Sequence, residues 1–133
     1  MMRRRLVGSL VRRRPVTITP KDTLLQAAEK MAAENVGALV VVEADNPNKP
    51  VAVISERDIV RAIAMKMPLS TPIEAFMSTG VVSIGEDADV DKAADLMIMH
   101  NIRHLVVVNK KGELVGMVSI RDVLRELRSP ASP

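Results

Sequence analysis

The sequence predicts an α/β fold made of two β-α-β-β-α repeats packed around a pseudo-two-fold axis. Its length of 133 residues is enough for one domain, or for two small halves that share a core. Its composition, 47% hydrophobic and 26% charged, is that of a folded globular protein. The decisive observation is that the second half of the chain repeats the first.

An offset of 66 residues aligns the two halves, pairing residues 16–18 with 82–84 and residues 39–42 with 105–108. After a two-residue length difference in a turn, an offset of 64 continues the alignment. It matches Ser55, Arg57, Asp58 and Arg61 with Ser119, Arg121, Asp122 and Arg125. The chain therefore contains one supersecondary unit twice.

Each repeat opens with a short β-rich stretch, residues 16–19 or 81–84, and continues into an amphipathic helix. Thr23 with Gln26 fits a capping box for the first of these helices, and Asp89 is the corresponding N-cap in the second repeat. Apolar residues then recur at helical spacing, starting from Leu24 and from Val90.

A continuous apolar run follows in each repeat, residues 38–42 or 105–108, as is typical of a strand buried on both faces. A polar turn, residues 43–50 or 109–112, leads to a third strand at 51–54 or 114–118. A second helix begins after Ser55 or Ser119.

These elements define the expected domain boundaries. The first repeat covers residues 8–67 and the second covers residues 73–128. A linker at 68–72 contains two prolines, and residues 1–7 and 129–133 are tails. Neither repeat alone is long enough to bury a good core, so we expect the two to pack face to face.

The charge is concentrated at the N-terminus. Six of the 19 Lys and Arg residues lie in the first fourteen positions, and the 13 that remain are outnumbered by 16 acidic residues. This basic segment indicates either a solvated tail or a binding site for nucleic acid or an anionic membrane. A single aromatic residue, Phe76, argues against stacking surfaces for single-stranded nucleic acid. No segment is long enough to span a membrane and there is no Cys, so we expect a soluble, cytoplasmic protein.

The shared Ser-x-Arg-Asp sequence stands where a strand turns into a helix in both repeats. Ser55 or Ser119 at the N-cap and Asp58 or Asp122 three residues later form a capping box. The same helix start also presents free N–H groups that can bind phosphate. An acidic residue there can accept hydrogen bonds from the two hydroxyls of a ribose. The two roles do not compete.

These residues resemble a known family, the cystathionine-β-synthase-type (CBS) domain, and two in tandem resemble a Bateman module. The resemblance is carried by residues 35–42 and 51–60 in the first repeat, and by residues 101–108, Gly112 and residues 114–123 in the second. It implies an adenosine nucleotide (AMP, ADP or ATP) as regulatory ligand in the clefts between the repeats, with no required cofactor and no metal. S-adenosylmethionine is the alternative ligand in this family.

The resemblance also implies site residues. Phosphate and ribose are held in the family by Gly-x-x-Ser/Thr-x-x-Asp, which Gly116, Ser119 and Asp122 match, with Arg121 inside the motif. In the first repeat Ser55, Arg57 and Asp58 match, but Ala52 replaces the glycine. Further residues expected to contact the adenine are Thr17, Ile18, Ser83, Ile84, Leu39 and Leu105, and those expected to contact phosphate are Arg103, His104, Arg13 and Arg14.

Enzymatic function finds little support, because the chain has two His, no Cys and no Gly-rich phosphate loop. We therefore predict a non-catalytic regulatory module that acts as an energy or metabolite sensor. The competing hypothesis is an adaptor that binds nucleic acid or protein through its Arg-rich N-terminal segment. Both helices near residues 97–99 and 59–64 carry apolar residues beyond one stripe, which predicts a homodimer.

Overall fold

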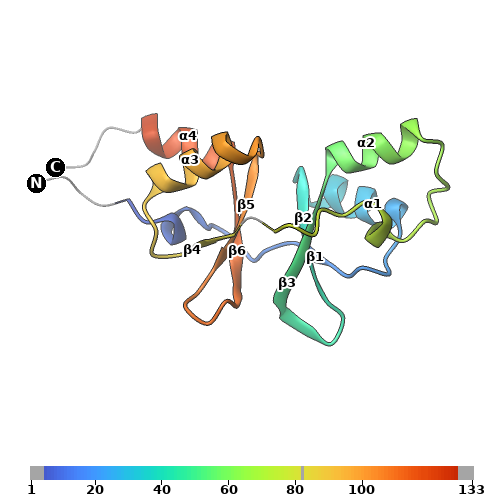
Figure 1. Cartoon of the computed structure of the whole chain (residues 1–133), viewed down its shortest axis with the longest axis horizontal. Coiled ribbons are helices and arrows are strands. Elements are labelled where there is room, and N and C mark those ends of the chain that lie inside the picture. Colours follow the sequence, from blue (N-terminus) through green and yellow to red (C-terminus); the bar gives the residue numbers. More distant parts are fainter. Residues whose placement is uncertain (1–4, 82, 129–133) are drawn as a thin grey trace, which may run out of the picture. The chain divides into compact units, whose positions relative to one another are not determined.

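The computed structural model describes residues 5–81 and 83–128, and the chain divides into two compact units (Figure 1). The first-repeat unit holds residues 15–81. The second-repeat unit combines the residues before Pro15 with those that follow Val81. The predicted tail at 129–133 lies outside the described residues.

The first-repeat unit is a three-stranded sheet with helices, as predicted. Its elements are β1 (Thr17–Ile18), α1 (Leu24–Glu34), β2 (Ala38–Glu43), β3 (Asn46–Ser55), α2 (Glu56–Ala64) and the short 3₁₀ helix η2 (Ile73–Ala75). The strand order is β1-β2-β3, in which β1 runs parallel and β3 antiparallel to β2. The buried strand β2 therefore lies in the centre of the sheet, as its continuous apolar run predicts.

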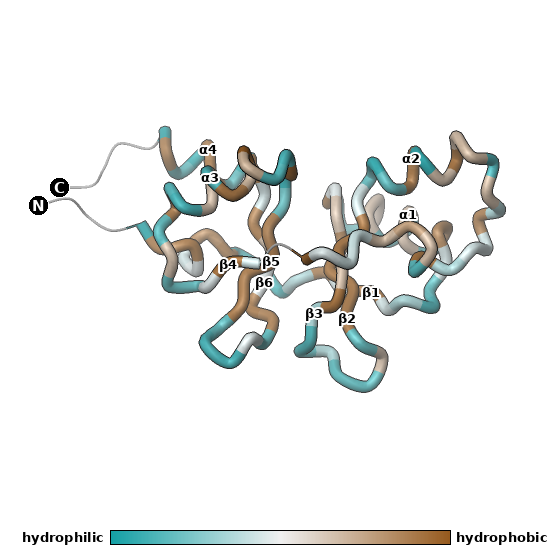
Figure 2. The backbone as a smooth tube through the Cα atoms, in the orientation of Figure 1, coloured by the Kyte–Doolittle hydropathy of each residue, from teal (hydrophilic) through white to brown (hydrophobic). Residues whose placement is uncertain are grey.

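The second-repeat unit has the same topology. Its elements are η1 (Val7–Leu10), β4 (Ser83–Gly85), α3 (Val90–His100), β5 (His104–Val108), β6 (Leu114–Ser119) and α4 (Ile120–Arg128). The strand order is β4-β5-β6, with β5 in the centre. Figure 2 shows hydrophobic residues along the strands and hydrophilic residues at the β2–β3 and β5–β6 turns. The two-repeat α/β fold is confirmed.

The helix ends follow from local chemistry. The hydroxyl of Thr23 accepts a hydrogen bond from the N–H of Gln26, whose side chain in turn accepts from the N–H of Thr23, so the predicted capping box is present. Asp89 caps α3 as predicted. Asn35 and Asn101 end α1 and α3 in the left-handed conformation, with φ of 54° and 52°, a role that Asn takes more readily than most residues.

The first hairpin differs from its prediction. Residues 43–50 were expected to form a turn, but β3 begins at Asn46, which leaves only Ala44 and Asp45 as the turn. Residues 46–49 are exposed, so they carry no hydrophobic alternation that could reveal a strand. Prolines are tolerated there because β3 is an edge strand, and irregular pairing near Val42 accommodates them.

The N-terminal segment, residues 5–14, belongs to the second-repeat unit. Val7 is fully buried and Leu10 is 8% exposed, and both lie in the core formed by β4, β5, β6, α3 and α4. The N–H of Val7 donates to the carbonyl of Ala88 at 2.8 Å, and that of Val90 donates to the carbonyl of Arg5 at 2.9 Å. Residues 5–7, predicted to be part of a tail, are therefore structural.

The segment between the repeats packs into the core of the first-repeat unit in the same way. Ile73, which is 66 residues after Val7, is fully buried in that unit's core. The N–H of Leu24 donates to the carbonyl of Thr71 at 2.9 Å, and Thr71 is the counterpart of Arg5. Residues 73–81, predicted to start the second repeat, thus pack against the first. Each core is closed by the segment that precedes the other repeat in the sequence.

Gly116 is the point where the N-terminal segment comes closest to β6. A Cβ atom at Gly116 would lie 2.5 Å from Cγ1 of Val11, a separation that a folded protein does not tolerate. Gly116 is buried, and Val11 packs at the edge of the core beside it. The absence of a side chain at position 116 therefore allows the N-terminal segment to dock.

We predict that Gly116→Ala destabilises the chain by about 1–3 kcal/mol, because the added methyl group overpacks against Val11. The urea midpoint of unfolding measures this loss. Adding Val11→Ala to the same chain should recover much of it. Gly85→Ala is the matched control, because a Cβ atom at Gly85 would meet nothing within 4 Å and little effect is expected. Equal midpoints for Gly116→Ala and Gly85→Ala would contradict the close approach.

Candidate functional site

The start of α4 carries the predicted Ser119–Asp122 pair in a closed hydrogen-bonded box. The Oδ2 atom of Asp122 accepts from the N–H of Ser119 at 2.8 Å and from its hydroxyl at 3.0 Å. The N–H of Asp122 donates to Oγ of Ser119 at 3.2 Å. The capping role expected from the sequence is therefore present, and it uses only one of the two carboxylate oxygens of Asp122.

The second oxygen of Asp122 faces a positive charge. Its Oδ1 atom lies 3.7 Å from Nη1 of Arg125, one turn further along α4, and the Asp122 side chain is 28% exposed. The loose separation and the partial exposure make this a weak ion pair. Asp122 thus keeps an accessible hydrogen-bond acceptor at the start of α4.

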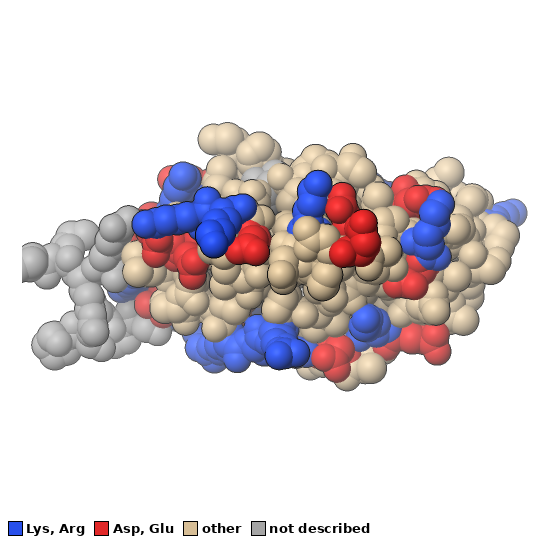
Figure 3. All heavy atoms as spheres, turned by 90° about the horizontal axis from the view of Figure 1, so that it is seen from below, with Lys and Arg blue, Asp and Glu red and all other residues tan. Residues whose placement is uncertain are grey.

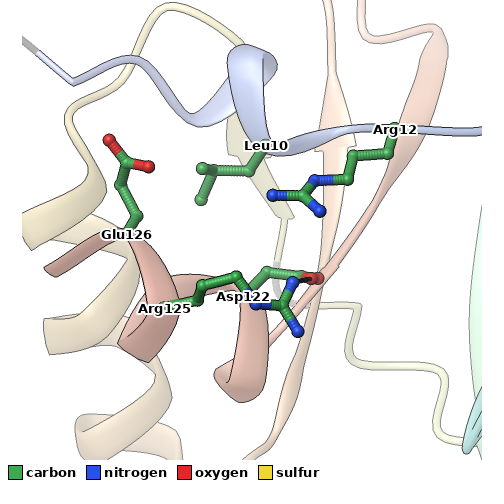
Figure 4. Close-up of a pocket in the computed structure, with 5 residues that line it drawn as sticks. All are labelled: Leu10, Arg12, Asp122, Arg125 and Glu126. Atoms are coloured by element: carbon green, nitrogen blue, oxygen red, sulfur yellow. Dashed lines mark ion pairs between the residues drawn. The ribbon is translucent and has the colours of Figure 1, made fainter. Parts of the chain in front are cut away.

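A small pocket of about 60 Å³ opens beside this carboxylate, entirely within the second-repeat unit (Figure 4). Leu10 and Arg12 of the N-terminal segment form one wall. Asp122, Arg125 and Glu126 of α4 form the other. The two walls are held together by Arg5, whose guanidinium donates to the carbonyl of Glu126 at 2.7 Å.

Arg12 contributes an uncompensated positive charge to this pocket. Its side chain has no hydrogen-bond or ion-pair partner among the described residues, and it is exposed to solvent. In Figure 4 its guanidinium lies near Asp122 and Arg125, whereas the carboxylate of Glu126 lies on the far side of Leu10. An anionic group entering the pocket would therefore meet a free guanidinium.

The start of α2 has the same capping box, but its acidic residue is less accessible to solvent. Oδ2 of Asp58 accepts from the N–H and the hydroxyl of Ser55 at 2.8 and 3.0 Å, as in the second repeat. Asp58, however, is only 6% exposed. Of the two predicted acidic residues, Asp122 is the more accessible one.

Four predicted adenine contacts lie in the hydrophobic cores. Leu39 and Leu105 are fully buried, and Ile18 and Ile84 are each 3% exposed. The expectation that Leu39 and Leu105 form an apolar ligand wall stays a prediction; in the structure both side chains are enclosed by core residues. Most side chains of the two central strands are buried, and the sequence does not show on which face a ligand lies.

The neighbouring backbone is more accessible. Thr17 in β1 and Ser83 in β4 lie on edge strands, so their outward backbone groups are not used by a second neighbouring strand. The carbonyl of Thr17 accepts from Nζ of Lys30 at 2.6 Å. The residue corresponding to Lys30 in the second repeat is Leu96, which cannot donate a hydrogen bond.

The predicted basic residues are not among those that line this pocket. Arg57 and Arg121 are exposed in the first turns of α2 and α4, next to the acidic residues. The carbonyl of Arg103 accepts from the N–H of Ile120 at 2.8 Å, which places Arg103 at the start of α4. His104 begins β5 and is half-buried. Arg13 and Arg14 continue from Arg12 along the exposed part of the N-terminal segment.

Gly116 makes room for a segment of the chain itself, since Val11 occupies the space beside this residue. The contact with phosphate and ribose that the resemblance implies for Gly116 stays a prediction. In the first repeat the counterpart Ala52 is fully buried, and Met77, which is 66 residues after Val11, packs against that unit's core.

Leu10, Arg125 and Glu126 line the pocket but were not among the expected site residues, and of the arginines at 12–14 only Arg13 and Arg14 were. A signal existed for Arg125, since both repeats carry an Arg three residues after the Asp. Leu10 could have been found by extending the 66-residue offset toward the N-terminus, where it pairs with Phe76. Glu126 has no such signal, because its counterpart is Ala62.

The charge distribution elsewhere is mixed. Figure 3 shows acidic side chains next to most of the basic ones on the face that it presents. Among the described residues, no three His, Asp or Glu side chains are grouped as a metal site would require. Within the same ranges, none of the helices has the length and apolar character needed to cross a bilayer.

Known proteins share both the sequence pattern and the fold. The family model for the CBS domain matches twice, at residues 7–65 and 73–129. A 17.7 kDa protein in the bps2 3′ region of Acidianus ambivalens is 37% identical over 121 residues, which are 91% of this chain and 72% of that protein.

Two solved structures are similar over almost the whole chain. The CBS domain protein PAE2072 from Pyrobaculum aerophilum, complexed with AMP, is 41% identical with a TM-score of 0.86, covering 92% of this chain and 97% of that chain. The CBS domain pair of protein MJ0100, in complex with 5′-methylthioadenosine and S-adenosyl-L-methionine, is 28% identical with a TM-score of 0.85, covering 94% and 97%. The present chain therefore belongs to the CBS domain family and is a tandem pair of these domains.

Proposed function

We propose that this protein is a non-catalytic regulatory module that binds an adenosine nucleotide (AMP, ADP or ATP) and acts as an energy or metabolite sensor. The observation that carries the proposal is the accessible Oδ1 of Asp122, which lies beside a pocket lined by Arg12 and Arg125. Support comes from the AMP complex of the relative that is 41% identical. S-adenosylmethionine is the alternative ligand, in view of the MJ0100 complex.

The capping box fits the ribose. Oδ2 of Asp122 is held by Ser119, which orients the carboxylate and leaves Oδ1 as the acceptor for the two ribose hydroxyls. The ion pair between Arg125 and Asp122 is weak, so a ligand that enters can replace it. A hydrogen bond to a charged group contributes about 1.5–3 kcal/mol, so this contact alone would discriminate between sugars.

The adenine ring would be recognised by backbone rather than by side-chain walls. Ser83 and Ile84 lie on the edge strand β4, whose outward N–H and C=O groups can pair with the edge of a base. Ser83 is exposed, whereas Ile84 is buried and supports the strand from the core. Thr17 and Ile18 occupy the corresponding place in the first repeat, where Lys30 already uses the carbonyl of Thr17.

We predict that AMP binds on the order of tenfold or more tightly than 2′-deoxy-AMP, because losing one hydroxyl removes a charge-assisted hydrogen bond. Asp122→Ala should remove this preference. Ligand-induced thermal stabilisation measures both effects, since a hundredfold excess over Kd stabilises the folded state by about 2.7 kcal/mol.

Asp89→Ala is the matched control, because it removes a carboxylate that caps a helix in the same unit but lies outside the pocket. Both variants should lose about 1 kcal/mol of stability as a lost helix cap does. Only Asp122→Ala should lose the preference for ribose. If AMP and its deoxy form stabilise the wild type equally, Asp122 is a helix cap and no more.

The exposed helix faces support a homodimer. Val60 and Ile63 on α2 are 64% and 58% exposed, Leu124 on α4 is 52%, and Ile98 and Met99 on α3 are 78% and 73%. These exposures exceed what a solvated helix face normally carries in large apolar residues. Other residues of the predicted patches do not take part: Met97 and Ala62 are buried and Ile59 packs against the core.

We predict a dimer at micromolar concentration in sedimentation equilibrium, about twice the chain mass of 14.5 kDa. The double variant Ile63→Glu/Leu124→Glu should sediment as a monomer, because charges would be buried in the contact. Lys110→Glu, in the exposed β5–β6 turn, serves as the control and should stay dimeric. A wild-type mass equal to one chain would refute the homodimer.

A further inference from the structure

We propose that the second-repeat pocket is the phosphate-selective site of this chain, and that Arg12 from the N-terminal segment is the residue that selects for a phosphorylated ligand. The corresponding place in the first-repeat unit lacks this selection. This inference rests on the proposed function, because it takes the ligand to be an adenosine compound. It adds which of the two sites recognises phosphate, and by which residue.

The two units share their ribose-binding elements. Ser55, Asp58 and Arg61 in the first repeat correspond to Ser119, Asp122 and Arg125 in the second. Both capping boxes have the same hydrogen bonds, at 2.8 and 3.0 Å. These residues therefore cannot distinguish one site from the other by their chemistry.

The segments that close the two cores are different in charge. Shifted by 66 residues, Arg12 corresponds to Ser78, which is polar but uncharged. The two positions correspond in the sequence, and both lie in a segment that closes a core. Ser78 exchanges backbone hydrogen bonds with Val53 of β3, at 2.9 and 3.1 Å, and Arg12 follows Val11, which lies against β6 at Gly116.

A second basic residue shows the same asymmetry. The carbonyl of Arg103 accepts from the N–H of Ile120 at the start of α4, and the carbonyl of Gly37 accepts from Glu56 at the start of α2, at 2.8 and 3.0 Å. The second-repeat unit thus places Arg103 beside the helix start where the first-repeat unit has Gly37. Counted together with the acidic Glu126, whose counterpart is Ala62, the two arginines leave the second site more positive by one charge.

Of these charges, Arg12 is the one aimed into the pocket. It lines the cavity with Asp122 and has no partner among the residues that the structure describes. A guanidinium offers paired N–H donors that match a phosphate group. A phosphorylated nucleoside therefore binds more tightly at this site because of Arg12. The affinity of a neutral nucleoside does not depend on Arg12, and the sulfonium cation of S-adenosylmethionine is repelled by it.

The test is isothermal titration of the full chain with AMP, adenosine and S-adenosylmethionine. We expect the wild type to bind AMP at least about tenfold more tightly than adenosine, with S-adenosylmethionine weakest. Arg12→Ala should weaken the binding of AMP by about tenfold and leave the affinity for adenosine unchanged. Raising the salt concentration should reproduce this change in part, because the contact is exposed to solvent.

Lys110→Ala is the matched control: it removes one positive charge from the exposed β5–β6 turn and should change neither affinity. If Arg12→Ala binds AMP as the wild type does, or if the wild type does not prefer AMP to adenosine, the inference is overturned while the proposed function stands. If none of the three compounds binds, and neither ADP nor ATP binds in their place, the proposed function fails and the inference fails with it.

Discussion

The closing of each hydrophobic core by a segment from outside its own repeat is the constraint on which the structure depends. Val7 and Ile73 stand 66 residues apart, and both are fully buried in a core made mostly by other elements. Burying such a side chain contributes about 1.5–3 kcal/mol, which is a substantial part of the stability of about 5–15 kcal/mol typical of a domain. Because the N-terminal segment closes the second core, the second-repeat unit is not a continuous stretch of sequence, whereas the first-repeat unit runs without a break from Pro15 to Val81.

The same closing of the second core builds the candidate site. One wall of the pocket comes from the N-terminal segment and the other from α4, which are more than a hundred residues apart in the chain. The contact between Val11 and Gly116 sets how closely the segment approaches β6, and Arg5 holds it to α4 through the carbonyl of Glu126. The position of Arg12 is therefore a consequence of core packing on one side and a backbone hydrogen bond on the other.

Asp122 shows how one side chain serves both stability and recognition. Its Oδ2 completes the capping box with Ser119, and its Oδ1 remains accessible beside Arg125. The capping hydrogen bonds fix the carboxylate before any ligand arrives, so little conformational entropy remains to be lost on binding. Asp58 forms the same box but is buried. The cap is thus common to both repeats, while the opportunity for binding depends on what surrounds it.

The two-repeat α/β fold, the capping boxes at Thr23 and Ser119, and the central strands could be predicted from the residues alone, because these depend on local periodicity and on hydrogen bonds between near neighbours. That β3 begins at Asn46 could not be predicted, since exposed edge residues carry no hydrophobic pattern. The enclosure of Leu39 and Leu105 in the cores, the space that Gly116 leaves for Val11, and the pocket that Arg12 shares with Asp122 became visible in the folded chain. Each of these depends on which distant segment packs against a repeat, and the free energy of that choice lies in non-local burial that no short stretch of sequence contains.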